Sequence, residues 1–404
     1  MITRFRVQNF KALRDVTLDL TPIHVLIGPN DSGKTSILEA IAALCRSVDH
    51  QLSDAFVGLW KGRELVWRGG HDQYVEFTAD VKTEEHSYNY HLECEFFGSS
   101  TQRPNRQAHS AEETILLGAE SIGLKPFGGA WSGANRIRWH EDSKISIEPT
   151  SEQLNAANLL HHSLANVHLC RWIPGTLALP AAINSARQYR METSGFGLVT
   201  LLDDIISYDR DRFSALEEQF QSVFDRVLAI RLLSEPAFKD QADNSTQIPL
   251  FERADGKGLY FHFRNQTDLV PASQVSDGML IVLAYLALLY LPEPPRVILV
   301  EEPENGIHPK RLQDVLTILR ELVDEQSRTQ VIMTTHSPYV VDMFKPDEVT
   351  LCQQQNDGSV SVRKLSESEA VRRQLDVFTL GEIWTAEGDA ALSQSATPGM
   401  GGGG

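Results

Sequence analysis

The residues Gly28 to Thr35 have the spacing G-x-x-x-x-G-K-[ST], between an apolar stretch, His24–Ile27, and a stretch with helical periodicity, Thr35–Cys45. The glycines let backbone N–H groups curl around phosphate groups, and the helix points the positive end of its dipole at them. Lys34 adds a mobile cation, and the Thr35 hydroxyl suits Mg²⁺. The motif therefore predicts a site for the phosphates of a nucleotide. Its members would be Asn30, Asp31, Ser32, Gly33, Lys34, Thr35 and Ser36.

Two adjacent carboxylates, Glu301 and Glu302, follow the apolar strand predicted at Val297–Val300. A Mg²⁺–nucleotide site needs one carboxylate near the metal and another that orients the attacking water. We assign Glu301 to the metal and Glu302 to the water. A strand with a solvated acidic end is the alternative interpretation, and it weakens once the phosphate motif is considered with it.

Two further motifs lie where ligands bind in α/β proteins. His336, in the run TTHSP, follows the apolar strand Val331–Met333, at the edge where parallel sheets bind ligands. It could hydrogen-bond a γ-phosphate or hold the water. Ser276, Asp277 and Gly278 lead into the apolar helix predicted at Met279–Leu291, so they form a second potential anion site at a helix N-terminus. In isolation, this segment would be interpreted as an ordinary capped helix.

The four motifs, in their order along the chain, resemble those of ABC-type ATPases. Among these ATPases, they resemble most the soluble RecF/SMC/OLD-like group. The opening Phe5–Lys11, FRVQNFK, and the run EPENGIHP from Glu302 to Pro309 are similar to segments of that group. The resemblance covers about residues 1–80 and 270–350.

The resemblance implies that nucleotide lies between the phosphate loop of one subunit and Ser276 and Gly278 of a second, in a head-to-tail homodimer. It implies ATP and Mg²⁺ as ligands. Gln73 becomes a candidate metal-site glutamine, and Lys11 a residue that approaches the nucleotide. Residues Asn305–His308 would link the two sites across the interface.

The patterns along the chain predict an α/β fold with an antiparallel β subdomain and a helical insertion. The resemblance implies a P-loop NTPase with an ABC-type head and a mixed central sheet. We expect an N-terminal lobe at 1–150, the insertion at 151–240, a C-terminal lobe at 241–392 and a disordered tail at 393–404. Within these, Leu198–Tyr208 and Phe213–Leu233 have helical spacing, and Asp255–Gly258 resembles a hairpin turn. The segment Gly98–Pro149 has no pattern that organises it.

The composition favours a cytoplasmic protein. The formal net charge of −17 does not indicate a nucleic-acid binder, although a local basic face stays open. The four cysteines are scattered, which favours reduced, buried thiols. No stretch approaches the roughly 20 apolar residues that cross a bilayer, and the N-terminus has no signal-peptide core. OLD proteins carry a C-terminal nuclease domain, whereas the stretch after His336 is short, so we expect no intrinsic nuclease activity.

Three functions are open at this point. The first is an ATPase switch whose closure drives a separate effector protein, in phage defence or DNA repair. The second is an ATP-gated nucleic-acid clamp, which requires an ATPase that nucleic acid stimulates in a salt-sensitive way. The third is a transporter ATPase subunit, which requires a membrane partner; the S-D-G signature and the long insertion argue against it.

Overall fold

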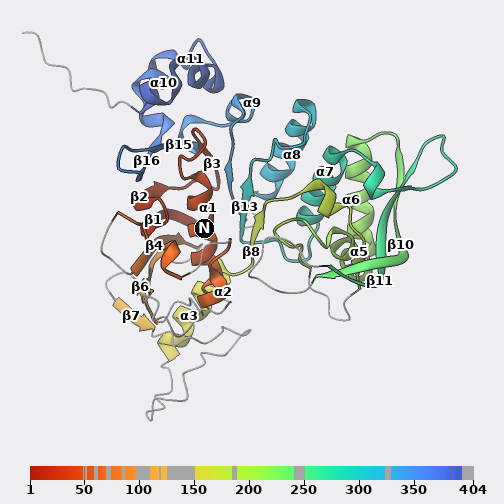
Figure 1. Ribbon diagram of the computed structural model, residues 1–404, viewed down its shortest axis with the longest axis horizontal. Coiled ribbons are helices and arrows are strands. Elements are labelled where there is room, and N and C mark those ends of the chain that lie inside the picture. The colour runs from red at the N-terminus through yellow and green to blue at the C-terminus, as the bar shows by residue number, and fades with distance from the viewer. Residues whose placement is uncertain are drawn as a thin grey trace, which may run out of the picture. The chain divides into compact units, whose positions relative to one another are not determined.

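The computed structural model describes the chain except residues 49, 51, 59–61, 70–73, 84–86, 97–109, 118–119, 125–150, 184–188, 241–250, 324–328 and 394–404. The chain divides into two compact units. Unit 1 comprises Met1–Val167 and Ile332–Gly404, and unit 2 comprises His168–Val331. Figure 1 shows their elements.

Unit 1 contains an antiparallel sheet with the order β2-β1-β4-β5-β6-β7. In β4 (Tyr74–Lys82) and β5 (Ser87–Glu95), every second side chain is buried, which is the alternation that a half-buried strand requires. The strands predicted in this part of the chain are confirmed. The other strands are β1 (Ile2–Phe10), β2 (Leu13–Asp19), β6 (Ser110–Leu117) and β7 (Glu120–Leu124). The last two lie in the stretch that had no recognisable pattern.

A second sheet of unit 1 carries the phosphate motif. The strand β3 (Ile23–Ile27) is buried along its whole length and pairs in parallel with β15 (Val349–Gln354), which pairs antiparallel with β16 (Val360–Lys364). The sheet is therefore mixed, as expected. The strand β14 (Gln330–Thr334) crosses the boundary between the units. The helix α1 (Lys34–Arg46) begins directly after the phosphate loop.

Unit 1 also contains helices besides α1. They are α2 (Leu52–Ala55), η1 (Gly62–Leu65), α3 (Ser151–Leu164), α9 (Pro338–Val341), η3 (Pro346–Glu348), η4 (Leu365–Glu367), α10 (Glu369–Gln374) and α11 (Leu380–Leu392). The start of α11 is packed on α9, because Gly381 N donates to Asp342 Oδ1 at 2.6 Å. A Cβ on Gly381 would lie 2.4 Å from the carbonyl oxygen of Pro338, so only glycine permits this approach.

Unit 2 is built around α7 (Asp277–Leu289), which is apolar on all sides and buried from Met279 to Leu288. Such a helix belongs in a protein core rather than at a surface. The helix α8 (Pro309–Leu322) packs against it, and the strands β13 (Val297–Glu301) and β8 (Val167–Cys170) are neighbours in a sheet. The remaining helices are α4 (Pro174–Leu177), α5 (Leu198–Tyr208), α6 (Arg210–Val223) and η2 (Ala272–Gln274).

A long antiparallel pair in unit 2 corrects two expectations. The strand β10 (Val227–Asp240) pairs with β11 (Phe251–Phe263) along its whole length, and short strands β9 (Ala181–Ala182) and β12 (Val270–Pro271) join them. The helix predicted over Phe213–Leu233 therefore ends at Val223, and its last part is a strand. The turn predicted at Asp255–Gly258 was also wrong, because these residues lie inside β11 (green in Figure 1).

The four cysteines match a simpler expectation. Cys45, Cys94, Cys170 and Cys352 are free thiols and all are buried. Among the described residues, no helix combines the length and the apolar character that a bilayer crossing demands.

Candidate functional site

The phosphate loop of unit 1 wraps around the side chain of its lysine. Lys34 Nζ donates to the carbonyl oxygens of Gly28, at 2.9 Å, and Pro29, at 2.7 Å. It also lies 3.4 Å from Ser32 Oγ, and it is only 6% exposed. The cation is thus held by its own loop at the N-terminus of α1, where a phosphate could replace these neutral acceptors with a charged one.

Two glycines of the loop have no room for a side chain. Gly28 has φ +136° and Gly33 has φ +86°, which L-residues rarely adopt. A Cβ on Gly28 would lie 2.2 Å from the carbonyl oxygen of Cys352, and one on Gly33 would lie 2.5 Å from Val360 Cγ2. The loop is therefore seated tightly against β15 and β16, and burial raises the pKa of the Cys352 thiol behind it to about 12.

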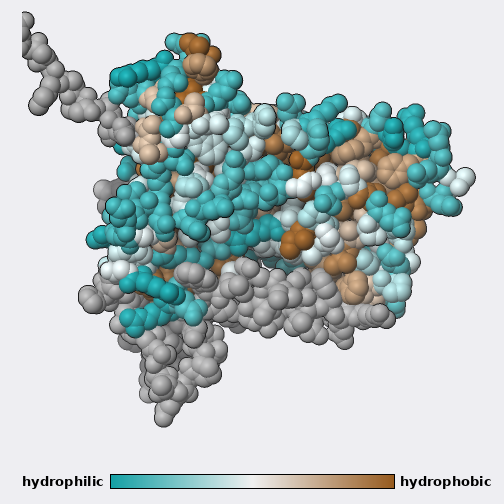
Figure 2. All heavy atoms as spheres, turned by 45° about the horizontal axis from the view of Figure 1, so that its top comes forward, coloured by the Kyte–Doolittle hydropathy of each residue, from teal (hydrophilic) through white to brown (hydrophobic). Residues whose placement is uncertain are grey.

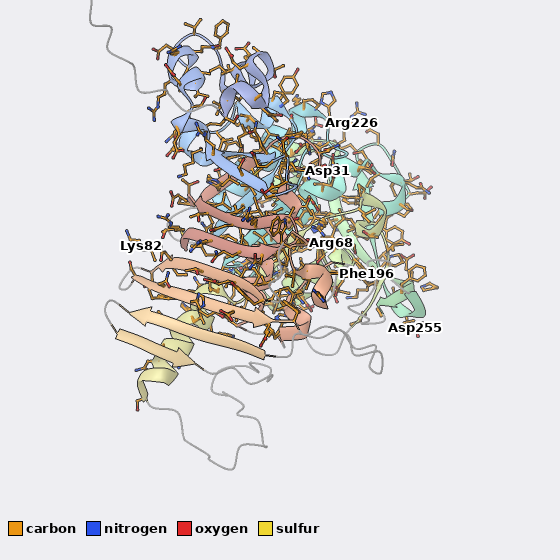
Figure 3. The ribbon with its side chains drawn as sticks, turned by 60° about the vertical axis from the view of Figure 1, so that its left-hand side comes forward. Asp31, Arg68, Lys82, Phe196, Arg226 and Asp255 are labelled. Atoms are coloured by element: carbon orange, nitrogen blue, oxygen red, sulfur yellow. The ribbon has the colours of Figure 1, made fainter. Side chains whose placement is uncertain are left out.

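Some of the polar groups that the sequence assigned to the phosphates and the metal are accessible, although Ser32 and Lys34 are buried. Asp31 and Thr35 are exposed and Ser36 is half-buried. Figure 3 labels Asp31 in the loop between β3 and α1. Asp31 has φ +64°, a left-handed conformation that aspartate tolerates better than most residues. Oxygen donors of this kind suit Mg²⁺.

His336 follows β14 within the same unit as the phosphate loop. The residue before it, Thr335, donates its backbone N–H to the carbonyl oxygen of Leu26 in β3 at 3.1 Å. Its hydroxyl accepts from Ser337 N at 3.0 Å, which shapes the turn that presents His336. The histidine is half-buried. The structure thus places His336 near the end of β3, the strand that precedes the phosphate loop.

Two further candidates, Lys11 and Gln73, have different outcomes. Lys11 forms a buried ion pair with Glu39 of α1, with the two side chains 9% and 5% exposed. This contact ties the turn after β1 to the helix that follows the phosphate loop, and it gives Lys11 a structural partner. Gln73 lies outside the described residues.

The carboxylates of unit 2 line a pocket of about 280 Å³. Glu301, the last residue of β13, forms an ion pair with Arg171, which follows β8. The two side chains are 20% and 19% exposed. The other lining residues are Cys170, Trp172, Ile281, Tyr285, Glu302, Pro303 and Asn305. Burial, with Cys170 and Glu304 nearby, holds the pKa of Tyr285 well above its usual range, so its hydroxyl stays protonated.

Glu302 occupies an unusual backbone position beside this pocket. Its φ is +49°, which directs the chain out of β13 in a sharp turn. Asn305 closes the turn twice: its backbone N donates to Glu302 O at 3.0 Å and its side-chain Nδ2 to Glu302 Oε2 at 2.7 Å. The carboxylate is therefore oriented by an amide from the segment that follows it.

The serine–glycine segment forms the exposed tip of α7. Ser276 is the N-cap residue, and its side chain makes no capping hydrogen bond. Ser276 and Asp277 are exposed, and a Cβ on Gly278 would meet nothing within 4 Å. Gly306, just beyond the carboxylates, approaches this tip, because its Cβ would lie 3.7 Å from Asp277 Cβ. The second helix N-terminus is thus open, with an unused hydroxyl.

Sequence reasoning missed Arg171 and Trp172. A single arginine after a four-residue strand, far along the chain from Glu301, has no pattern that marks it. Its contact with Glu301 forms because β8 and β13 are neighbours in the sheet. Trp172 packs on Tyr285 of α7, with ring centroids 4.5 Å apart.

Comparison with solved structures places the fold. An SMC head bound to the C-terminal winged-helix domain of ScpA matches 90% of this chain and 97% of that one, with a TM-score of 0.51 and 15% identity. An SMC head with an extended coiled coil, bound to the C-terminal domain of ScpA from Pyrococcus furiosus, gives a TM-score of 0.50 at 12% identity, over 93% and 99% of the two chains. With the phosphate loop described above, this fold defines a P-loop ATPase with an ABC-type head.

Sequence relatives agree with that class. An OLD nuclease of Thermus scotoductus is 22% identical over 91% of this chain, which spans only 65% of the nuclease. An ATP/GTP phosphatase of Helicobacter pylori is 20% identical, with 85% and 87% of the two chains covered. The replication and repair protein RecF of Rhodococcus erythropolis is 28% identical over 30% of each chain.

A family match is more specific. Residues 23–342 match the family described as "AAA domain, putative AbiEii toxin, Type IV TA system", and the chain belongs to it. It is a RecF/SMC/OLD-like P-loop ATPase.

Proposed function

We propose that this ATPase is a homodimeric switch in which bound ATP closes two copies head to tail and hydrolysis releases them. The observation that carries the proposal is the exposed tip of α7. The phosphate loop encloses the N-terminus of α1. The N-terminus of α7 is exposed instead: the Ser276 side chain makes no capping hydrogen bond, and a Cβ on Gly278 would meet nothing within 4 Å. A γ-phosphate contacted by both, one from each copy, would supply the differential contacts that favour the closed state.

The residues divide the chemistry between them. Lys34 and the loop's backbone N–H groups would hold the β- and γ-phosphates, and Thr35 and Glu301 would hold Mg²⁺. When bound, Mg²⁺ neutralises charge that develops on the phosphate oxygens. Glu302, oriented by Asn305, would accept a proton from the attacking water, and His336 would hydrogen-bond the γ-phosphate.

Replacing Glu302 by Gln tests the water-activating role. We expect the variant to bind MgATP, to turn it over very slowly, and to accumulate as a dimer in size-exclusion chromatography with light scattering. Glutamine keeps the size of the side chain and one acceptor oxygen but cannot accept the proton. Normal ATP turnover by Glu302→Gln would refute the assignment.

Ser276→Arg tests the trans contact, with Ser273→Arg as its matched control. Both serines are exposed, and they lie close together in the sequence, but only Ser276 occupies the N-cap position of α7. In the Glu302→Gln background, Ser276→Arg should abolish the dimer and leave nucleotide binding by the monomer intact, whereas Ser273→Arg should preserve both. Loss of monomer binding in Ser276→Arg would contradict the geometry.

We infer that a separate effector protein docks on the C-terminal helices of unit 1. Tyr339 on α9 is 70% exposed, and Val377 and Phe378, between α10 and α11, are 76% and 50% exposed. Figure 2 shows hydrophobic atoms at the surface of these helices. Tyr339 is only three residues from His336 along the chain, so a change at the γ-phosphate could reach this surface. These exposed apolar side chains favour a partner with apolar anchors.

The docking surface predicts a separation of functions. Phe378→Ser with Val377→Ser should leave ATP turnover unchanged and abolish protection in a phage challenge of cells that carry the gene with its genomic neighbours. The control is Leu233→Ser, which replaces a side chain that is 40% exposed in unit 2. Full protection by the double variant would refute the proposal that an effector docks on this surface. Loss of ATP turnover would show that Val377 and Phe378 are needed for the ATPase activity itself.

A further inference from the structure

Arg171 lies beside the carboxylate that the metal requires. It follows β8, the neighbour of β13, and its guanidinium Nε donates to Glu301 Oε2. Both side chains are about four-fifths buried and both line the pocket that also contains Glu302. A partly buried carboxylate in this position is stabilised by a cation, and here the chain itself supplies one.

The backbone around Arg171 is fixed rather than free to follow its side chain. Its N–H donates to the carbonyl oxygen of Thr193 at 3.0 Å, and Ile173 N donates to Ser194 O at 2.9 Å. Between them, Trp172 packs on Tyr285 of α7 with ring centroids 4.5 Å apart. The guanidinium can therefore change partners by rotating its own side chain, while its Cα stays in place.

Resting on the proposed function, we propose that Arg171 is a positioning residue that occupies Glu301 until a magnesium-bound nucleotide arrives. Arg171 and Mg²⁺ are two cations that compete for the same carboxylate. The phosphates of the nucleotide bring negative charge that can accept the guanidinium in exchange. Glu301 is then released to the metal only when nucleotide is present. Without nucleotide, Glu301 would stay paired with Arg171, so Mg²⁺ would bind there only weakly.

The consequence is a measurable dependence on the Mg²⁺ concentration. Without the guanidinium, Glu301 has no competing cation from Arg171, so Mg²⁺ should bind at lower concentration. We expect Arg171→Gln to lower the Mg²⁺ concentration needed for half-maximal binding of a fluorescent, non-hydrolysable ATP analogue by about five-fold or more, the size of a weak ion pair. Arg171→Lys keeps a cation there and should stay within about two-fold of wild type.

The matched control is Arg231→Gln. Arg231 also belongs to unit 2 and pairs with a glutamate, Glu217, at 3.9 Å, but it does not line the pocket. This variant should leave the Mg²⁺ titration unchanged. Binding is measured by fluorescence anisotropy, so the result does not depend on turnover, and urea unfolding in EDTA reports on folding separately.

The outcomes distinguish the possible errors. A leftward shift in Arg171→Gln, absent in Arg171→Lys and Arg231→Gln, supports the competition. An unchanged or rightward-shifted titration in Arg171→Gln overturns it, and if the variant is also less stable to urea, Arg171 is only structural. If the wild-type protein fails to bind the analogue at any Mg²⁺ concentration, the proposed function itself is wrong.

Discussion

Two glycine-to-alanine substitutions should separate the stability of the protein from its activity. Gly28 has φ +136°, and its Cβ would lie 2.2 Å from the carbonyl oxygen of Cys352. A left-handed conformation costs an L-residue about 1–2 kcal/mol, and forcing a methyl group into a packed site costs about 1–3 kcal/mol more. We therefore expect Gly28→Ala to lower the free energy of unfolding by about 2–5 kcal/mol.

Gly278→Ala should behave in the other way. Its Cβ would meet nothing within 4 Å, and the residue lies in the first turn of α7. Alanine is preferred over glycine in a helix by up to about 1 kcal/mol, so the free energy of unfolding should stay constant or rise slightly. The added methyl group nevertheless lies on the surface that we propose to approach a phosphate of the partner copy. We expect ATP turnover to fall at least about ten-fold, a loss of about 1.4 kcal/mol of transition-state stabilisation.

Urea unfolding and steady-state ATP turnover, measured on both variants, check this pair. Gly28→Ala should lose stability and nucleotide binding together, whereas Gly278→Ala should lose turnover alone. Wild-type turnover in a stable Gly278→Ala protein would refute the approach of a phosphate to the tip of α7. Wild-type stability of Gly28→Ala would refute the tight seating of the loop.

Three further predictions concern the supports of the site. Burial lowers the pKa of His24, on the strand before the phosphate loop, from 6.5 to about 3, so the unfolded chain takes up a proton below pH 6.5 that the folded chain refuses. The free energy of unfolding should therefore fall as the pH drops from 6.5 toward 3, by up to about 1.4 kcal/mol per pH unit from this group. Urea unfolding of His24→Gln at several pH values should show a shallower dependence of this free energy on pH. Glu39→Gln should lower the free energy of unfolding by about 3–5 kcal/mol, because it leaves the buried ammonium of Lys11 without its carboxylate, and Lys11→Met added to it should restore part of the loss. Trp172→Leu should reduce the cooperativity of ATP turnover with ATP concentration; an unchanged Hill coefficient above 1 would exclude Trp172 as a link between sites.

The parts of the fold that sequence patterns predicted are those in which local chemistry and the tertiary structure agree. The strand β3, the loop and α1 could be predicted because a phosphate-binding motif also requires a strand, a left-handed glycine and a helix start. The double carboxylate after β13 was predictable for the same reason. In α7, the continuous apolar run predicted a buried helix, which is confirmed.

Two secondary-structure predictions were wrong because a local sequence pattern had a different structural cause from the one inferred. The glycines of the expected turn at Asp255–Gly258 instead allow close packing inside β11. A Cβ on Gly256 would lie 2.2 Å from the carbonyl oxygen of Ala181, and one on Gly258 would lie 1.5 Å from Glu235 Oε1. The helical spacing over Phe213–Leu233 continues by chance across the end of α6, and pairing with β11 decides that its last part, from Val227, is a strand.

Contacts inside unit 2 give the proposed switch a physical basis for communication. The tip of α7 is approached by Gly306, four residues beyond Glu302, and the body of α7 holds Trp172, the neighbour of Arg171. Packed cores change between discrete arrangements rather than deforming gradually. A partner nucleotide that moves the α7 tip must therefore also disturb the segments that carry Arg171 and Glu302. If one γ-phosphate in a head-to-tail dimer contacts α7 of the opposite copy, its arrival would change how that copy holds Glu301 and Glu302. Each copy would then hydrolyse fastest only when both sites are filled.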